Sequence, residues 1–418
     1  MIWFAAIIIP LFCYLESPIA RLILGFIFLS KLFAYWRSSK LEFHFSKTNN
    51  LFSEFVEKSK IKKMKYEPYL WAPFSFQQGV FYIVSEKIYK KLNPNNFKRE
   101  AITLPDGGTI GFDWDGDIPD PTEKPDKPYL LICPGLGGDS QNLYSLMLLW
   151  AARKQGYKVA TILSRGASGL PFTSPKLNCA ASWRDIEAAI DYFYEKYGLD
   201  PKTKEKRTRI YAYGVSLGAL LLYQYLGRAG EKTSKILDGA SIFSNVWNTS
   251  RSNPRFLARS YGLYNWLLGI NLNNLIRKNQ LPLMKKIMEK DAYEDLANAL
   301  ETNRSGLDHL ERRVYAKMYG FKNRHEYYND VSADRYTKQI TVPVFALHSK
   351  DDPICEADFI PFKDIEAEDS KVMVSLTESG AHACHVTGSI LPRLWYQKPC
   401  LEFINFLEQK HAPKNEEK

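Results

Sequence analysis

The sequence predicts an α/β protein with a mostly parallel central sheet, helices on both faces of the sheet and an inserted helical lid. Three observations support this prediction. Short apolar runs typical of buried strands alternate with helical patterns over residues 98–244. A G-x-S-x-G turn at residues 214–218 separates one such strand from an apolar helix. The alternation breaks over residues 245–335, which are helical in pattern, and resumes over residues 336–410.

Two apolar runs open the chain, Met1–Leu15 and Ile19–Trp36, and Glu16-Ser17-Pro18 separates them. A spanning helix needs about 20 apolar residues. The second run is long enough, and its two charged residues can snorkel if they lie near its ends. No basic segment precedes the first run, so a cleaved signal peptide is less favoured. We expect an uncleaved membrane anchor over residues 1–40, as one span or a shallow hairpin; the alternative is a buried helix of a soluble protein.

Residues 41–97 form a basic extension that contains an aromatic stretch, Tyr66–Phe74. We expect the aromatic stretch to be a loop packed on the core. Basic segments that flank a membrane helix tend to stay on the cytoplasmic side. We expect the protein to be held at a membrane, the endoplasmic reticulum or another endomembrane.

The first part of the core begins with a hairpin signal. Residues 98–104 and 109–114 read as two strands around Pro105-Asp106-Gly107-Gly108. Strands follow at 129–133 and 157–163. They are joined by Pro134-Gly135-Leu136-Gly137-Gly138 and a helix that we expect to start at Asp139-Ser140-Gln141. A glycine-rich turn after a strand exposes backbone N–H groups, and this one lacks the lysine and spacing of a phosphate-binding loop.

An amphipathic helix is expected over residues 181–197, after the loop Ser164–Gly169. Arg165 in that loop and Asp185 in the helix could be catalytic. We favour a structural role for both, as partners that order the loop beside the site.

The G-x-S-x-G turn has the arrangement of a nucleophile elbow, because strand 209–213 precedes it and an apolar helix, ending at Gly227, follows it. Glycines two residues before and after Ser216 let strand and helix pack closely. The serine hydroxyl then stands clear of the sheet. If Ser216 is a nucleophile, the N–H groups of Leu217 and Leu136 can form an oxyanion hole.

A carboxylate and a histidine follow later strands. Strand 342–348 leads to Asp352, which we expect to orient the histidine, with Asp351 as the second choice. Strand 371–376 leads to His382, the expected base, with His385 as the fallback. The order Ser216, Asp352, His382 is that of the α/β-hydrolase fold.

The remaining segments complete the domain organisation. Strand 237–243 closes the first part of the core, and residues 393–409 are expected to form a closing helix. Residues 411–418 form a polar tail that we expect to be disordered.

Charge and cysteine content narrow the function further. The net charge of +10 is moderate and scattered, so nucleic-acid binding is disfavoured and an anionic membrane surface fits the basic residues better. The six cysteines are far apart, which suits a reduced compartment. Cys355, His382, Cys384 and His385 match no zinc spacing. We expect no metal or organic cofactor.

Over about residues 60–410 the chain resembles the membrane-anchored α/β-hydrolase-domain family, which includes lipid esterases, phospholipases and medium-chain ester synthases. The motifs that carry the resemblance are Pro134–Gly138, Ser164-Arg165-Gly166 with Asp185, Gly214–Gly218, Tyr319-Gly320-Phe321 with Glu326-Tyr327-Tyr328, Asp352-Pro353 and Gly380-Ala381-His382. The resemblance implies an N-terminal anchor, a Ser216–Asp352–His382 triad and acyl-ester substrates.

Two segments depart from the family pattern. Gly380-Ala381-His382-Ala383-Cys384 stands where the family has Gly-Gly-His followed by Gly-Phe. Phe76-Gln77-Gln78-Gly79 stands where the family has Gly-His followed by Gln-Thr. Neither departure removes a triad residue, and both concern the shape of the pocket.

The sequence therefore predicts a membrane-associated serine hydrolase that cleaves lipid or other acyl esters through an acyl-enzyme. One alternative is an acyltransferase with the same triad, although neither His382 nor His385 is followed five residues later by the aspartate that accompanies transfer in some relatives. A second alternative is a non-catalytic lipid or steroid binder on the same fold.

Overall fold

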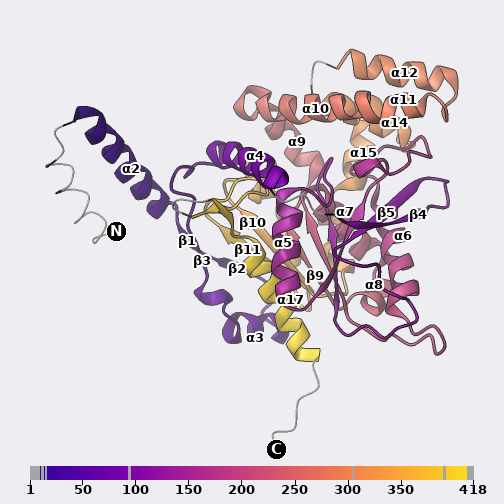
Figure 1. Cartoon of the computed structure of the whole chain (residues 1–418), viewed down its shortest axis with the longest axis horizontal. Helices are drawn as coiled ribbons and strands as arrows, with labels where there is room; N and C mark the ends of the chain where they lie inside the picture. Colours follow the sequence, from indigo (N-terminus) through magenta and orange to yellow (C-terminus); the bar gives the residue numbers. More distant parts are fainter. Residues whose placement is uncertain are drawn as a thin grey trace, which may run out of the picture.

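A computed structural model of the chain describes residues 10, 14, 17–92, 96–303, 306–388 and 392–411. Its centre is a nine-stranded sheet (Figure 1). In spatial order the strands are β2 (Glu42–His44), β11 (Val372–Thr377), β10 (Val344–Ser349), β9 (Gly239–Phe243), β8 (Ile210–Val215), β6 (Tyr129–Cys133), β7 (Lys158–Leu163), β5 (Thr109–Trp114) and β4 (Lys98–Thr103).

The strands from β7 through β11 in this sheet run parallel, as alternating strands and helices require. Antiparallel strands lie at both edges: the β4–β5 hairpin joins β7, and β2 pairs with β11. From β4 to β11 this is the strand order of the α/β-hydrolase fold, so the predicted fold class and the predicted hairpin are confirmed. The edge strand β2 was not predicted, because it comes from the extension that precedes the core.

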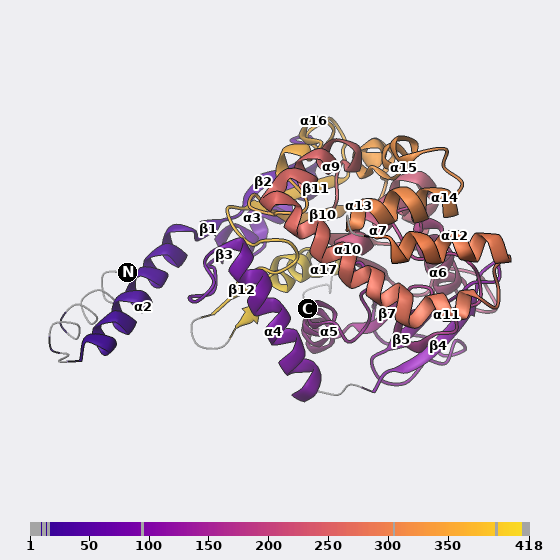
Figure 2. The same ribbon diagram turned by 90° about the horizontal axis from the view of Figure 1, so that it is seen from above.

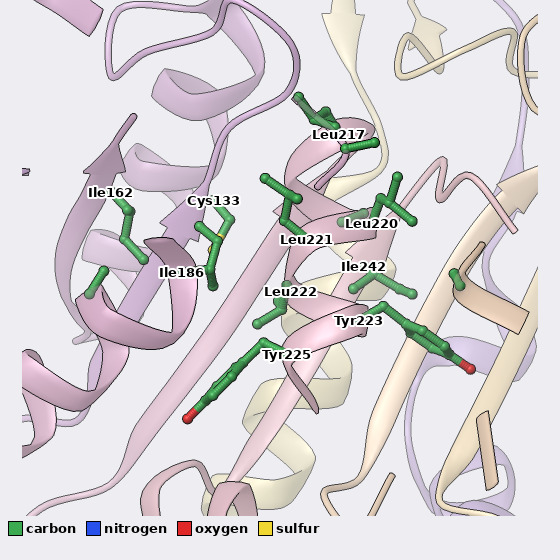
Figure 3. Close-up of a cluster of buried hydrophobic side chains, with 14 of the residues drawn as sticks. Cys133, Ile162, Ile186, Leu217, Leu220, Leu221, Leu222, Tyr223, Tyr225 and Ile242 are labelled. Carbon is green, nitrogen blue, oxygen red and sulfur yellow. The ribbon is translucent and has the colours of Figure 1, made fainter. Parts of the chain in front are cut away.

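Alternate side chains of the strands enter two apolar clusters, one on each face of the sheet. In β6, Leu131 and Cys133 belong to one cluster, whereas Leu130 and Ile132 belong to the other. Figure 3 shows part of the first cluster, where Cys133 and Ile162 face Leu221 and Ile186. The helices α6 (Trp183–Phe193), α7 (Leu217–Ala229) and α8 (Glu231–Ile236) contribute to the first cluster, and α3 (Asn50–Lys58), α5 (Leu143–Lys154) and α17 (Gln397–His411) contribute to the second.

A run of helices lies between β9 and β10 and is seen at the top of Figure 1. Its α-helices are α9 (Thr249–Ala258), α10 (Leu263–Leu275), α11 (Leu281–Met284), α12 (Lys290–Glu301), α13 (Leu307–Leu310), α14 (Ala316–Met318) and α15 (Arg324–Val331). They leave the sheet at the carboxyl end of β9, which is the edge where loops of such sheets form sites.

The N-terminal region contains two long helices, α2 (Pro18–Trp36) and α4 (Ser75–Leu92), and a short pair of strands, β1 (Ser39–Lys40) and β3 (Lys65–Tyr66). Among the described residues, α2 is the one helix long and apolar enough to cross a membrane. It projects away from the body in both views (Figures 1 and 2). Apart from residues 10 and 14, the first apolar run lies outside the described residues, as does residue 412 onward of the predicted tail. The aromatic stretch packs on the core as expected, and Tyr66 and Tyr69 are buried.

Three predicted helix boundaries were wrong. The helix expected at residues 139–141 begins at Leu143. Helix α7 continues past Gly227 to Ala229, because that glycine is needed for packing: a Cβ there would lie within 3.0 Å of the Tyr336 backbone. The closing helix begins at Gln397, and Arg393–Leu394 instead forms strand β13, paired with β12 (Val386–Thr387).

Candidate active site

Ser216 stands at the turn between β8 and α7, with a strained backbone at φ 52° and ψ −117°. The flanking glycines make this turn possible. A Cβ on Gly218 would meet the carbonyl oxygens of Cys133 and Pro134, and one on Gly214 would meet the α7 backbone, all within 3.0 Å. The close packing inferred from the two glycines is therefore present, and it holds the serine side chain at the end of the sheet.

The three residues predicted as a triad form one chain of hydrogen bonds. The Ser216 Oγ lies 2.8 Å from Nε2 of His382. The other ring nitrogen of His382, Nδ1, lies 2.8 Å from Oδ2 of Asp352. Asp352 follows β10 and His382 follows β11, so adjacent parallel strands deliver the acid and the base to the same edge as the serine. These contacts have the geometry of a nucleophile, a base and an orienting acid.

Asp352 is completely buried and is held as an anion. Burial acts to raise the pKa of its carboxyl, but the charge and hydrogen bond of His382 outweigh burial and lower that pKa below its usual value. The second carboxylate oxygen, Oδ1, accepts hydrogen bonds of 2.8 Å from the N–H groups of Ile354 and Cys355. An ionised carboxylate fixed in this way can hold the histidine ring in one orientation.

The two fallback residues have other partners. Asp351 forms an ion pair with Arg37, at the end of α2, and accepts hydrogen bonds from Ser75 Oγ at 2.7 Å and the Ala381 N–H at 3.0 Å. His385 is buried and lies 2.8 Å from the Thr377 hydroxyl. Burial lowers the pKa of His385 to about 3, so its ring is neutral at physiological pH. Asp351 therefore braces the segment that carries His382, a role that no sequence pattern indicated.

The segment that carries His382 contains one of the two departures from the family pattern, Gly380–Cys384. Ala381 and Ala383 have φ values of 56° and 53°, in the left-handed region that favours glycine. Hydrogen bonds hold this backbone: the Ala381 carbonyl accepts from Ser349 Oγ at 2.8 Å, and the Ala383 N–H donates to Ser244 Oγ at 2.9 Å. Hydroxyl groups thus hold the left-handed backbone of these two alanines.

The two N–H groups predicted as an oxyanion hole lie beside the serine. Leu136 and Leu217 line the same cavity as Ser216 and His382. Leu217 is the first residue of α7, so its N–H has no acceptor within the helix. Within the ranges that the structure describes, the N–H of Leu136 has no acceptor either. Tyr144 fixes the turn before it, since its hydroxyl accepts from the Gly135 N–H at 3.0 Å.

This cavity has a volume of about 280 Å³ and is lined mostly by apolar side chains, among them Leu220, Val246, Leu268, Leu307 and Ile354. A second cavity, of about 500 Å³, shares Leu136 and Tyr315 with the first and is bordered by polar groups of Asp139, Ser168, Asn178, Asn279 and Gln280. A mostly apolar compartment at the serine and a compartment of mixed polar and apolar lining beside it suit an amphipathic ligand.

Glu311 is an unexpected acidic residue in the wall of the apolar cavity. Burial raises the pKa of its carboxyl to about 7, and the Tyr328 hydroxyl donates to it at 2.6 Å. A carboxyl in this state changes its protonation around neutral pH. No sequence pattern marks Glu311, because a lone glutamate in a helical segment has the pattern of a solvated residue.

Arg165 and Asp185 form a buried bidentate ion pair, with N–O distances of 2.7 and 2.8 Å. Arg165 also binds Asp106 and Ser174, so it ties its loop to α6 and to the β4–β5 turn. This is the structural role that the sequence analysis favoured.

Ligand atoms of Asp352, Cys355 and His382 lie within 4.8 Å of one another, close enough to be considered as metal ligands. Two of the three are the acid and base of the hydrogen-bonded chain. Burial raises the pKa of the Cys355 thiol well above its usual value, so the thiolate that a metal requires is disfavoured. The residues present fit a proton relay better than a metal centre.

Comparison with known proteins finds several curated relatives, among them a phospholipase and a monoacylglycerol lipase. No protein-family model matches the chain. It is similar to "Phospholipase ABHD3" of Mus musculus, with 29% identity over 305 residues that cover 72% of this chain and 69% of that protein. It is also similar to "Protein abhd-3.2" of Caenorhabditis elegans, at 26% identity over 86% of this chain and 91% of that protein. "Monoacylglycerol lipase ABHD2" of Homo sapiens is 25% identical over 82% of this chain and 80% of that protein.

Among solved structures, the Pyrococcus furiosus esterase Pf2001 superposes with a TM-score of 0.45 and 14% identity, over 77% of this chain and 92% of that one. The naproxen esterase of Bacillus subtilis gives a TM-score of 0.43 and 12% identity, over 80% of this chain and 98% of that one. The fold assignment rests on the strand order given above. Together, that strand order and the serine turn show the α/β-hydrolase fold, and the curated relatives show that the chain is similar to phospholipases and lipases.

Proposed function

We propose that this protein is a membrane-associated serine hydrolase that cleaves carboxylic esters of lipids through an acyl-enzyme. The observation that carries the proposal is the continuous hydrogen bonding from Ser216 through His382 to a buried, ionised Asp352. Ser216 and His382 line an apolar cavity, and the N–H groups of Leu136 and Leu217 beside them have no acceptor among the described residues. Curated relatives that are named phospholipase and monoacylglycerol lipase support the same reaction class.

In the proposed mechanism the Ser216 oxygen attacks the ester carbonyl while Nε2 of His382 takes the hydroxyl proton. The carbonyl oxygen becomes an oxyanion and is stabilised by the N–H groups of Leu136 and Leu217. His382 then gives its proton to the departing alcohol oxygen as the carbon–oxygen bond breaks. A water molecule, deprotonated by His382, then attacks the acyl-enzyme carbonyl. His382 returns this proton to the Ser216 oxygen as the acyl–oxygen bond breaks, which releases the acid and the free serine. Asp352 stays ionised and stabilises the imidazolium in both halves of the cycle.

The two cavities indicate which kind of ester fits. The acyl chain, which is apolar, would occupy the cavity of about 280 Å³ at Ser216, because burial of apolar surface is favourable there. The polar portion of the ester would lie in the cavity of about 500 Å³ beside the Gly137–Asp139 turn. A glycerolipid, with acyl chains on one side of the ester and a polar group on the other, has this division.

The membrane association proposed here rests on α2. It is long enough to span, mostly exposed, and followed by Arg37, Lys40 and Lys47, a flank that tends to remain cytoplasmic. We further propose that the part of the chain after α2 lies on the cytoplasmic side of the endoplasmic reticulum or of another endomembrane.

The second candidate function is that of an acyltransferase, and the larger of the two cavities supports it. A space of about 500 Å³ that reaches the oxyanion turn could hold an alcohol that attacks the acyl-enzyme in place of water. Both reactions share the acyl-enzyme, so the triad does not separate them.

The test is product analysis with the full chain in phospholipid vesicles that contain a monoacyl or diacyl glycerolipid, with and without an added alcohol. Release of free fatty acid by the wild type, lost in Ser216→Ala and retained in a surface control such as Ser234→Ala, would support hydrolysis. A new ester formed at the expense of fatty acid would identify a transferase. Fatty-acid release that survives Ser216→Ala would refute the assignment of the nucleophile.

A further inference from the structure

The outer face of α4 is a continuous apolar surface without a partner among the described residues. Phe76, Val80, Ile83, Val84 and Ile88 are 44–57% exposed. Their spacing of four, three, one and four residues puts them on one side of the helix. Contiguous exposed apolar surface of this kind marks an interaction site in a native protein.

The opposite face of α4 holds the helix firmly on the body. Tyr82 lines the cavity of Ser216 and stacks on Tyr144, with ring centroids 6.5 Å apart. Glu86 accepts a hydrogen bond of 3.0 Å from the Asn142 side chain at the start of α5. The exposed apolar residues are therefore presented by a fixed helix that also forms one wall of the site.

Helix α10 repeats this arrangement on another wall of the cavity. Leu268 lines the cavity, whereas its neighbours Trp266 and Leu267 are 46% and 38% exposed. In the view from above, α4 and α10 are both in front of the sheet (Figure 2). Two helices that contribute to the cavity thus carry exposed apolar side chains next in sequence to those that line it.

The start of α4 is joined to the end of α2, the helix proposed to enter the membrane. The rings of Phe33, near the end of α2, and Phe74, just before α4, are 5.6 Å apart. In the middle of α2, the ring of Phe26 lies 6.1 Å from that of Trp71, in the segment that leads to α4. Asp351 bonds to both Arg37 and Ser75, which fixes the two helices to one carboxylate. If α2 enters a bilayer, the apolar face of α4 begins next to its surface.

Lysines border the exposed apolar side chains. Lys87 and Lys91 are exposed near the end of α4, and Lys285 and Lys286 are exposed between Leu283 and Ile287 in the lid. Lysines with apolar neighbours can lay their stems on hydrocarbon while the ammonium groups reach anionic headgroups. This pattern fits a phospholipid surface better than the apolar core of a protein–protein contact, from which charge is depleted.

We propose that α4 and the outer edge of α10 lie in the headgroup–acyl boundary of the bilayer that α2 enters, so that the Ser216 cavity opens toward lipid. This inference rests on the membrane association in the proposed function and adds a second contact that orients the site. An ester chain can then pass from the bilayer into the cavity along the apolar edges of α4 and α10.

The direct test is spin labelling of the full chain in vesicles of zwitterionic and anionic phospholipid. A nitroxide is attached through Ile83→Cys and, as the matched control, through Ile118→Cys. Ile118 is also exposed, but it follows β5, next to the edge of the sheet that β4 forms, and it is not part of α4. The parent chain, labelled in parallel, gives the background from its own cysteines.

The proposal expects the label at position 83 to collide with oxygen dissolved in the lipid and to be shielded from a water-soluble nickel complex. The label at position 118 should show the reverse. A water-exposed label at position 83 would overturn the proposal. Shielding at position 83 that persists in detergent and scales with protein concentration would indicate a second copy of the chain instead, and would also overturn it.

An activity ratio separates this inference from the proposed function. Ile83→Glu should lower hydrolysis of an ester embedded in vesicles, relative to hydrolysis of a water-soluble short-chain ester, by about tenfold, since it removes apolar contact and adds charge. Ile118→Glu should leave the ratio unchanged. An unchanged ratio in Ile83→Glu would contradict the inference. Absence of both activities in the wild type would contradict the proposed function. The spin-labelling result is independent of both activities.

Discussion

Ser216 and His382 both depend on unusual backbone conformations, but the segments that carry them are stabilised in different ways. At the serine, glycines at 214 and 218 remove side chains that would collide with neighbouring backbone. At the histidine, alanines occupy left-handed positions at 381 and 383, and hydroxyl groups hold the backbone in place. One segment is shaped by steric exclusion within a strand–turn–helix unit, and the other by hydrogen bonds from distant strands.

This contrast indicates how each segment should fail. A side chain added at the serine turn meets backbone that cannot move without separating β8 from its neighbours. A hydrogen bond removed at the histidine segment leaves the fold in place and lets the ring move. We therefore expect the serine turn to respond with loss of the fold and the histidine segment to respond with loss of rate.

The largest effect is expected for Gly218→Ala. Its Cβ would lie within 3.0 Å of the Cys133 and Pro134 carbonyl oxygens, so the protein should lose about 3 kcal/mol or more of unfolding free energy. Thermal unfolding and soluble yield measure this. The matched control is Gly79→Ala in α4, where nothing lies within 4 Å and alanine should be neutral or stabilising. Equal behaviour of the two variants would contradict the steric account.

Ser244→Ala should lower kcat by about 10- to 100-fold, while its free energy of unfolding should change little more than that of its control variant. It removes the acceptor of the Ala383 N–H and so loosens the segment that positions His382. The control is Ser241→Ala, which removes a buried hydroxyl inside strand β9 that donates to the Cys400 carbonyl at 3.1 Å. A wild-type kcat in Ser244→Ala would show that this hydrogen bond does not position the base.

Acid should destabilise the histidine segment through His385. Because burial lowers the pKa of His385 from 6.5 to about 3, the unfolded chain binds a proton below pH 6.5 that the folded chain does not. The contribution is complete above pH 6.5 and is lost as the pH falls toward 3. Between pH 6.5 and about pH 5 the wild type should lose about 2 kcal/mol of unfolding free energy that His385→Gln does not lose. Parallel pH profiles of the two proteins in denaturant unfolding would rule out this contribution.

The smallest effect is expected for Ala383→Gly. Relief of the left-handed backbone should gain about 1 kcal/mol, and the added freedom of glycine in the unfolded chain should offset about half of that. We expect a melting temperature equal to the wild type or higher by a few degrees, with kcat within about twofold of the wild-type value. A clear loss of stability would mean that the Ala383 methyl group packs favourably and outweighs the strain.

The same contrast explains which parts of the molecule the sequence could predict. The serine turn, the individual core strands and the positions of Asp352 and His382 after their strands follow from local patterns, since each pattern lies within about ten residues. The bonds from Asp351 to Arg37 and Ser75, and from Ser244 to Ala383, join segments that are more than 130 residues apart, so no local pattern marks them. They arise only when the sheet brings its strand ends to one edge.

Errors at helix boundaries have a related cause. Glycine is typical of helix ends, but Gly227 lies within α7, where Tyr336 packs against it. Glutamate is typical of the protein surface, but the fold places Glu311 in the cavity wall. In both cases tertiary packing determines the role, and the local sequence carries no sign of the partner.

The measurement that tests the central claim most directly is active-site labelling of the purified chain with a fluorophosphonate, followed by mass spectrometry of the labelled peptide. We expect one phosphonylated serine, Ser216, in the wild type. Labelling should be absent in Ser216→Ala and slower in His382→Ala. No labelling of a folded wild type, or labelling at another serine, would contradict the central claim.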